Sequence, residues 1–258
     1  MVRLKVTVSY DGSHYEGFQS QHHGRTIQDE LQLALSRINK GFVPIVGSGR
    51  TDAGAHALGQ IFHFDPLVTM TCNSWNKALN RLLPDDIYVK NVCEVHSRFH
   101  ARHDAILKEY QYFLNQGTHN PLQINYCYQY GQKLQIEKMK EALLMFIGKH
   151  DFRNFCSNSE QENISFEREI ISASIELSAD IINFRFVGNG FLRYMVRFMV
   201  GALVAIGRGK LSLNECYQAL HPSAYRATLP YKVPSCGLYL VRVEYAQNNQ
   251  EVGDGHAC

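Results

Sequence analysis

The order of strand-like and helix-like segments is the feature that most limits the folds open to this chain. Residues 3–10 alternate Leu, Val, Val and Tyr with polar or small positions, which predicts a half-buried strand. Further strands are predicted at 43–46, 60–64 and 87–95, and helices at 26–40 and 73–83. This order of strand, helix, strand, strand, helix and strand is that of a split-βαβ, or ferredoxin-like, unit.

The second half repeats this order without obvious sequence identity. Strands are predicted at 105–114, 169–177, 181–187 and 237–245, and helices at 136–147, 190–206 and 213–220. The chain is therefore expected to be an α+β protein with a duplicated unit. We expect residues 1–104 to form the first half, residues 105–246 the second, and residues 247–258 a polar tail.

Composition excludes several classes of protein. The chain has 258 residues, 45% of them hydrophobic, which suffices for two modest cores. Its start runs directly into a strand pattern without a signal core, and its longest apolar run, 195–206, is interrupted by Arg197 and is too short to span a membrane. We expect a cytoplasmic protein without a membrane segment. The seven cysteines contain no Cys-x-x-Cys pair, so neither a disulfide framework nor a zinc ribbon is indicated.

A nucleic-acid surface would have to be a local patch, because the formal net charge is only +2. Cationic and imidazole side chains gather in sequence at two places. The first group is Arg98, His100, Arg102 and His103, and the second is Arg193, Arg197, Arg208 and Lys210. Such groups can also be ordinary solvated surface.

The stretch from Gly49 to Ala57 places Asp52 among glycines and alanines, which leave its carboxylate accessible. Glycines on both sides permit a ligand to approach the backbone closely. Arg50, two residues earlier, offers a fork of hydrogen-bond donors and a flat stacking surface. From the residues alone, the segment could be a catalytic loop or a polar turn in which the aspartate caps its own backbone.

Two residues of the second half could join Asp52. Tyr110 shares one face of a predicted strand with Lys108 and Tyr112, where packing is the simpler interpretation. Arg197 lies in a helix whose apolar residues surround most of its circumference, so it requires an anionic partner unless its side chain reaches bulk solvent or a phosphate. No metal site is indicated, because Asp52 and His56 are the only ligand-like pair near the loop.

Several motifs together resemble the tRNA pseudouridine synthase A family. They are Tyr10 to Gln19, Gly-Arg-Thr-Asp-Ala-Gly at 49–54, Phe-His-Ala-Arg at 99–102, the Tyr110 strand, 191–201 with its Met-Val-Arg, and Gly-Leu-Tyr-Leu at 237–240. They stand in the family's order over nearly the whole chain. The chain departs from the usual pattern at Phe18, where the family generally has Trp, and at Ala55, where it has Val.

The resemblance implies a fold and a reaction. The pseudouridine synthase fold has two ferredoxin-like halves that share a mostly antiparallel sheet around a central cleft. The family isomerises uridine to pseudouridine at positions 38, 39 and 40 of the tRNA anticodon stem-loop, without cofactor or metal. Its members are homodimers that bind tRNA across both subunits.

The resemblance also implies roles for individual residues. Asp52 matches the catalytic aspartate, and Arg197 matches the arginine that pairs with it. Tyr110 matches the tyrosine that stacks on the target base and is the suspected acceptor of its C5 proton. Because a stacked uridine must be extruded, we expect Arg50 to fill the gap that it leaves.

The residues leave the mechanism and the class of protein open. Asp52 could attack the ribose C1′ or the base C6, or act as the base that starts glycal formation. A non-catalytic RNA-binding module is a second interpretation, although its usual aromatic strand signature is missing. A metal-dependent phosphohydrolase that uses Asp52 and His56 is a third.

Overall fold

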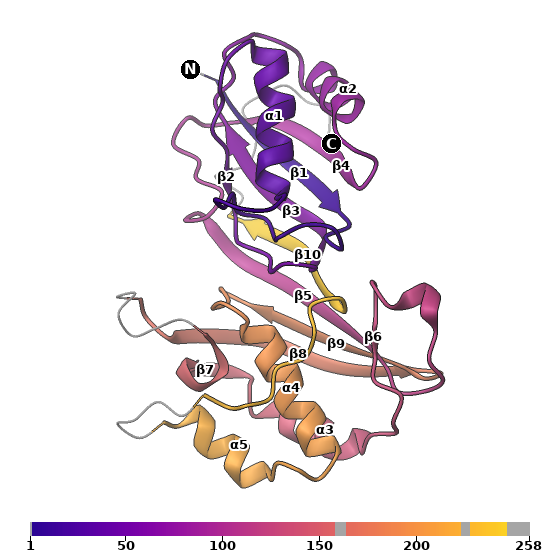
Figure 1. The fold of residues 1–258 in the computed structure, drawn as a ribbon. Coiled ribbons are helices and arrows are strands. Elements are labelled where there is room, and N and C mark those ends of the chain that lie inside the picture. The colour runs from indigo at the N-terminus through magenta and orange to yellow at the C-terminus, as the bar shows by residue number, and fades with distance from the viewer. Residues whose placement is uncertain (1, 158–163, 223–227, 247–258) are drawn as a thin grey trace. The chain divides into compact units, whose positions relative to one another are not determined.

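The structure, a computed structural model, describes residues 2–157, 164–222 and 228–246. They form two compact units, one of residues up to 106 together with the segment from 240, the other of residues 107–239 (Figure 1). Both units combine strands and helices, and the α+β class is confirmed. The segment from 240 groups with the first unit, whereas the sequence analysis places it in the second half. The predicted polar tail, 247–258, lies outside the described residues.

The first unit has the strand order expected of a split-βαβ unit. Its elements are β1 (Arg3–Tyr10), α1 (Ile27–Asn39), β2 (Val46–Gly47), β3 (His56–Phe64), α2 (Cys72–Leu82), β4 (Ile87–Val95) and β10 (Leu238–Tyr245). The order in the sheet is β4-β1-β3-β10, and β2 also pairs with β3. Both neighbours of β1 are antiparallel to it, as a split-βαβ unit requires.

Side-chain capping fixes where the two helices of this unit begin. The side chain of Thr26 accepts a hydrogen bond from the Asp29 backbone N–H and caps α1, which begins one residue after its predicted start at 26. Thr71, and not Asn73, caps α2, because its side chain accepts from the Ser74 N–H. Helix α2 therefore begins at Cys72, one residue before its predicted start, and its Trp75 is buried.

The strand predicted at 43–46 is also wrong, because only Val46 and Gly47 pair with β3. Pro44 has no N–H to donate to a ladder, so the segment before β2 runs beside the sheet without pairing. In contrast, β3 begins at His56, four residues before its predicted start at 60. The ladder between Ala57 and Tyr10 brings the end of the Asp52 segment directly onto β1.

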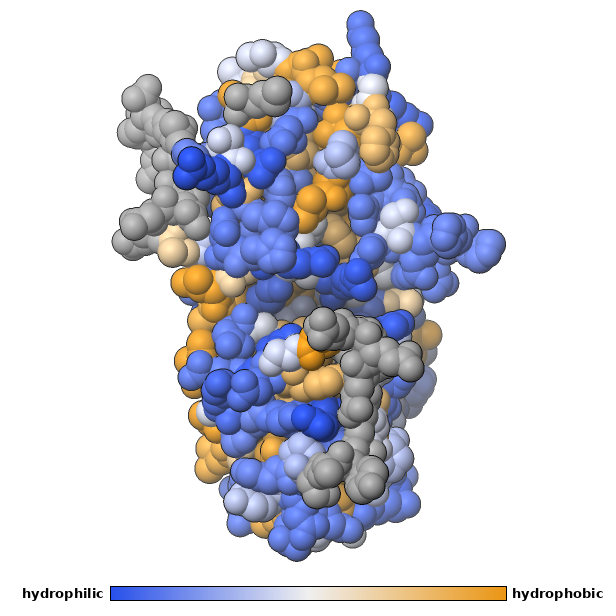
Figure 2. Space-filling model, turned by 90° about the vertical axis from the view of Figure 1, so that its left-hand side faces the viewer, coloured by the Kyte–Doolittle hydropathy of each residue, from blue (hydrophilic) through white to orange (hydrophobic). Residues whose placement is uncertain are grey.

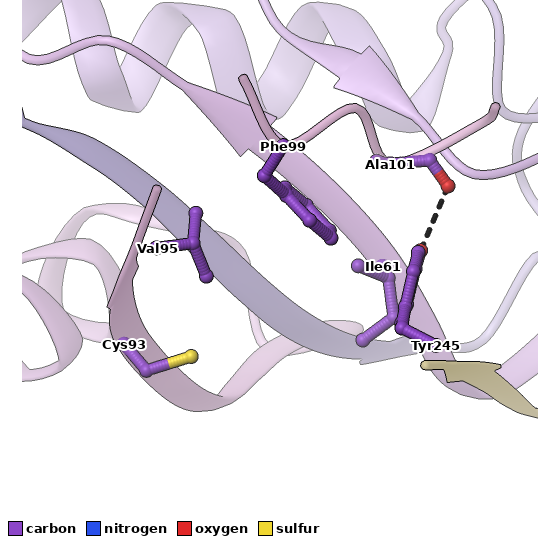
Figure 3. Packing of buried hydrophobic residues seen from close by; sticks show 6 residues of the cluster. All are labelled: Ile61, Cys93, Val95, Phe99, Ala101 and Tyr245. Atoms are coloured by element: carbon purple, nitrogen blue, oxygen red, sulfur yellow. Dashed lines mark hydrogen bonds between the residues drawn. The ribbon is translucent and has the colours of Figure 1, made fainter. Parts of the chain in front are cut away.

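Apolar residues cover both faces of the first sheet. On one face, Phe64 packs edge to face against Trp75 of α2, with ring centroids 5.2 Å apart. A second cluster, drawn in Figure 3, consists of Ile61, Cys93, Val95, Phe99, Ala101 and Tyr245. The Tyr245 hydroxyl donates to the Ala101 carbonyl at 2.8 Å. The segment that carries Phe99 and Ala101, just before the expected boundary at 104, therefore packs onto the first sheet.

The second unit contains elements that the sequence analysis did not predict. It comprises β5 (Ala105–Asn115), η1 (Pro121–Gln123), β6 (Tyr128–Gln129), α3 (Ile136–Leu144), β7 (Gly148–Asp151), η2 (Arg153–Phe155), β8 (Glu167–Ser178), β9 (Ile181–Gly188), α4 (Met195–Gly207) and α5 (Leu213–Leu220). Its strand order is β5-β9-β8-β7 with antiparallel neighbours, and β6 pairs with β5 in parallel. The short β6, β7, η1 and η2 are the unpredicted ones.

Helix α4 begins at Met195, not at Gly190 as predicted. The reason is Tyr194, whose φ is 63°. This angle lies in the left-handed region, so Tyr194 cannot be part of a right-handed helix. α5 has its predicted bounds and a complete capping box between Ser212 and Glu215.

Within the parts of the chain that the structure describes, no helix has the length and apolar character needed to cross a membrane. On the face drawn in Figure 2, hydrophilic residues predominate and hydrophobic ones form separate patches.

Candidate active site

Asp52 lies on a tight turn between β2 and β3. The Ala55 N–H donates to the Asp52 carbonyl at 3.1 Å, which closes a β-turn. Gly54 occupies the third position of that turn with φ of 73°, a conformation that favours glycine. Asp52 itself is half-buried, while Thr51 and Ala55 on either side are buried. The turn therefore fixes the backbone of Asp52, a residue that is not fully buried.

The loop after β1, residues 11–19, is hydrogen-bonded to the Asp52 turn. Backbone N–H groups cross between the two segments, from Phe18 to the Thr51 carbonyl and from Gly54 to the Tyr15 carbonyl, each at 3.2 Å. The Tyr10 hydroxyl lies 2.8 Å from Thr51 Oγ1, and both groups are buried. Burial raises the pKa of Tyr10, so this hydroxyl is protonated at neutral pH.

Two glycines allow this loop to approach the turn. A Cβ on Gly12 would lie 1.9 Å from the Ala55 carbonyl oxygen, and a Cβ on Gly17 would lie 2.7 Å from the Thr51 carbonyl oxygen. Both obstacles are backbone atoms of the Asp52 turn, which cannot rotate away as a side chain can. The loop and the turn therefore fit together only with glycine at these positions.

His56 and Gln60, in the first half of β3, make hydrogen bonds to the loop after β1 and to the segment that leads into the Asp52 turn. The Gly12 N–H donates to His56 Nδ1 at 3.2 Å, and Asp11 Oδ1 lies 3.2 Å from the same nitrogen. His56 is buried, and through this bond it holds the loop after β1 against β3. Gln60 accepts from Ser48 Oγ at 2.6 Å and donates to the Gly49 carbonyl at 3.0 Å. Asp52 is thus held from both ends of its segment.

Arg50 lies at the mouth of a pocket in the first unit. The pocket has a volume of about 210 Å³. Its lining residues come from three places in the chain: Phe18, Gln19 and Gln28; Ile45, Val46, Gly47 and Arg50; and His100, Arg102 and His103. The side chain of Arg50 is exposed, and only Thr51 separates it from Asp52 in sequence. A ligand that fills this pocket would therefore lie next to the segment that carries the aspartate.

Tyr110 lies in the second unit, on β5 opposite Phe186 of β9. Its ring packs edge to face against Phe191 with a centroid distance of 4.9 Å, and the residue is buried. Tyr112, two residues on, is fully buried and donates its hydroxyl to the Pro234 carbonyl at 2.9 Å. These contacts agree with the expectation that Tyr112 is a packing residue, and they fix the plane of the Tyr110 ring.

Arg197 also lies in the second unit, in the first turn of α4. Every other residue of that helix is buried, and Arg197 alone is partly accessible. Its Nε donates to the Val233 carbonyl at 2.9 Å, and its guanidinium lies 5.0 Å from the centre of the Tyr194 ring. Asp52 and Arg50 thus belong to the first unit, and Tyr110 and Arg197 to the second. The pairing of Asp52 with Tyr110 and Arg197 stays a prediction.

Tyr10, Thr51 and Gly12, which support the turn, could not be identified from the sequence. The one local signal is the Asp11-Gly12 pair directly after the first strand. Arg102 and His103 were predicted to belong to a cationic group, but their place beside Arg50 in one pocket was not predicted. Those contacts join segments that lie far apart in the chain.

Comparison with known proteins adds an independent result. The sequence description of one family, tRNA pseudouridine synthase, matches residues 6–104 and 142–246. A tRNA pseudouridine synthase A of Geobacillus sp. (strain WCH70) is 41% identical over 245 residues, which cover 94% of this chain and 98% of that protein. The proteins of the same name from Exiguobacterium sp. (strain ATCC BAA-1283 / AT1b) and Anoxybacillus flavithermus (strain DSM 21510 / WK1) are each 43% identical over 95% of this chain. They are covered over 98% and 99% of their own lengths. The chain belongs to the tRNA pseudouridine synthase family.

Proposed function

We propose that this chain isomerises uridine to pseudouridine at positions 38, 39 and 40 of the tRNA anticodon stem-loop, with Asp52 as the catalytic group. The observation that carries the proposal is the Asp52 turn. Its backbone is hydrogen-bonded to the loop after β1, the Thr51 side chain lies within hydrogen-bond distance of Tyr10, and Asp52 itself is only half-buried. A site held on rigid elements in this way can keep a carboxylate in one reactive position.

The reaction needs no redox partner. The bond between uracil N1 and ribose C1′ breaks, the base turns, and a bond forms between C5 and C1′. C5 loses its proton and N1 gains one, so the product has the same composition as the substrate. In each of the three routes open to Asp52, the carboxylate must be ionised to act as nucleophile or base.

The proposed partner that keeps Asp52 ionised is Arg197. This arginine interrupts a helix in which every other residue is buried, a place where a guanidinium requires an anion. An adjacent guanidinium lowers the pKa of a carboxyl group and thereby favours the reactive form. We expect Arg197→Lys to retain part of the activity and Arg197→Met to abolish it, measured as the single-turnover rate.

Tyr110 is the proposed platform for the extruded base and acceptor of its C5 proton. The ring is fixed by Phe191, and its face can offer stacking to a planar base. We expect Tyr110→Phe to keep stem-loop affinity and to slow product formation far more than it weakens binding. A wild-type single-turnover rate in this variant would return Tyr110 to a packing role.

The uridine must leave the stem before it can react, and Arg50 is the proposed residue that fills the vacated position. Its exposed guanidinium can stack between bases and contact phosphate at the same time. The protein is further proposed to act in the cytoplasm as a homodimer and without metal. Unchanged activity after dialysis against a chelator tests the last point, and sedimentation equilibrium tests the dimer.

The experiment that tests the function compares wild type with Asp52→Asn on an anticodon stem-loop. Asparagine has nearly the same shape but cannot be a carboxylate. We expect carbodiimide-dependent primer-extension stops at the three uridines with wild type and none with Asp52→Asn, at equal stem-loop affinity. Stops that persist with Asp52→Asn would remove Asp52 from its proposed role.

A further inference from the structure

Two arginines, Arg50 and Arg102, line the pocket described above. No carboxylate forms an ion pair with Arg50 or Arg102 within the described part of the chain. Elsewhere in the same unit Arg3 forms a bidentate pair with Asp65 at 2.7 Å, and Arg25 contacts Glu30 at 2.5 Å. Burial and the nearby charge of Arg50 lower the pKa of Arg102. An anion between the two guanidiniums would remove this repulsion.

The same pocket wall carries two histidines. His100 Nδ1 accepts hydrogen bonds from the backbone N–H groups of Arg102 and His103, both at 3.2 Å. Nδ1 is therefore unprotonated, and the proton of the neutral ring lies on Nε2, which can donate. Burial and the charges of His103 and Arg102 lower the pKa of His100, which agrees with a neutral ring. The His103 ring lies 4.1 Å from it, and both histidines line the same pocket as Arg102.

The turn that presents these groups, residues 100–104 and called the histidine turn here, is fixed to the first sheet. His63 Nδ1 accepts from the Ala101 N–H at 3.1 Å, and the Tyr245 hydroxyl donates to the Ala101 carbonyl at 2.8 Å. Asp104 closes the turn, since its carboxylate accepts from the His100 N–H at 2.8 Å and its N–H donates to the His100 carbonyl at 3.0 Å. A turn held this way loses little conformational entropy when a ligand binds.

The opposite wall of the pocket is equally fixed, and part of it is apolar. Gln28 accepts from the Ser20 N–H at 3.1 Å and donates to Gln32 at 3.0 Å, and Gln32 accepts from the Ile45 N–H at 3.3 Å. This chain of bonds joins α1 to the segment before β2. Ile45 and the ring of Phe18, both buried residues, add carbon surface to the lining.

We propose that this pocket binds one phosphodiester group of the tRNA backbone, with the Arg50 and Arg102 guanidiniums on its non-bridging oxygens and the adjoining ribose against Ile45 and Phe18. The inference rests on the proposed function, because it takes tRNA as the substrate. A phosphodiester is ionised at every pH at which the protein is folded, and the planar fork of arginine matches its oxygens. Such a contact fixes the position of the strand without reading its sequence.

The pocket lies close in sequence to the proposed catalytic residue, so a phosphate bound in it could position the RNA for the reaction. Arg50 lines the pocket and stands two residues before Asp52 on the same fixed segment. A phosphate held here would set the register of the RNA strand relative to the reactive carboxylate. It would also hold Arg50 in place, and so prepare it to occupy the gap left by the extruded base.

The first test is the salt dependence of stem-loop binding by the full chain. We expect Arg102→Gln to weaken binding about tenfold near physiological salt and to reduce the slope of log affinity against log salt by about 0.7 to 0.9, the contribution of one phosphate. Arg102→Lys should keep the slope, because it keeps the charge. Arg98→Gln is the matched control, since Arg98 is exposed in the same segment but does not line the pocket. An unchanged slope in Arg102→Gln would overturn the proposal.

The second test locates the phosphate. Stem-loops that carry a single uncharged methylphosphonate, moved one position at a time, are bound by wild type and by Arg102→Gln. We expect one position at which the methylphosphonate weakens wild-type binding and has no further effect on the variant. If the losses of affinity caused by the methylphosphonate and by Arg102→Gln are additive at every position, the pocket does not contact the RNA backbone. The same result together with binding of inorganic phosphate to the pocket would also refute a backbone contact.

These readouts separate the pocket from the reaction. If wild type makes pseudouridine but the losses are additive, the pocket proposal fails and the function stands. If wild type binds stem-loops with the expected coupling but makes no product, the proposed function fails instead. The folded state of each variant is checked by urea unfolding, which should give free energies within about 0.5 kcal/mol of wild type for these exposed positions.

Discussion

Replacing Gly12 with alanine should slow catalysis without removing any group that could touch RNA. The new Cβ would lie 1.9 Å from the Ala55 carbonyl oxygen, while real Cβ contacts stay at or beyond 3.0 Å, so loop and turn must separate by about 1.1 Å. The carbonyl belongs to the turn that carries Asp52, and His56 holds Gly12 from the other side. The displacement must therefore reach the carboxylate.

A shift of about 1 Å at a catalytic group can cost on the order of 100-fold in rate, and overpacking typically destabilises by about 1 to 3 kcal/mol. We expect Gly12→Ala to lower the single-turnover rate of pseudouridine formation by about 100-fold, with stem-loop affinity changed less than about threefold. The control is Gly41→Ala, whose Cβ would meet only the flexible end of Leu67 at 3.3 Å. A wild-type rate in a stably folded Gly12→Ala would show that the loop does not position Asp52.

Three further predictions concern groups that stabilise the two units. Tyr10→Phe and Thr51→Val each remove one partner of the 2.8 Å hydrogen bond between these two hydroxyls. In a double-mutant cycle of urea unfolding, we expect a coupling free energy of about 1 kcal/mol between the two substitutions. Additive effects on the free energy of unfolding would argue against the bond. Burial lowers the pKa of His63 to about 4, so the unfolded chain takes up its proton first as the pH falls below 6.5. Wild type should therefore lose about 2 kcal/mol more than His63→Asn between pH 7 and pH 5, whereas equal losses would contradict a neutral His63. Glu109→Gln should destabilise the protein by about 2 kcal/mol, because it leaves the bidentate partner Arg185, at 2.6 and 2.9 Å, without its carboxylate; a change below about 0.5 kcal/mol would contradict this.

The strongly periodic elements could be predicted from the sequence. β1, β4 and α5 have the predicted bounds, because each shows an uninterrupted period between clear turn or capping signals. The short β6 and β7 could not be found, since two to four residues are too few to show a period. α4 was predicted five residues too early because Phe191, Leu192 and Tyr194 extend the apolar pattern of the helix, and nothing in the composition reveals the left-handed conformation of Tyr194.

The site was predictable in part for a similar reason. The small residues around Asp52 predict an accessible carboxylate, and the resemblance of the motifs to the family predicts that this carboxylate is the catalytic one. The supports of that carboxylate, Tyr10 and Gly12, act through contacts with residues some 40 positions away. Sequence reasoning also separated Arg50 from Arg102, which line one pocket only because the 100–104 segment folds back onto the first sheet. Long-range packing of this kind has no local signature.

The most direct test of the account follows the hydrogen at uracil C5. Forming the bond between C5 and C1′ must expel that hydrogen to water, so tRNA labelled with tritium at uridine C5 reports the reaction without further chemistry. We predict that wild type releases tritium from the labelled anticodon stem-loop and that Asp52→Asn, although it binds the same RNA, releases none. Release by Asp52→Asn at the wild-type rate, or no release by wild type bound to its RNA, would contradict the central claim that the Asp52 carboxylate drives this isomerisation.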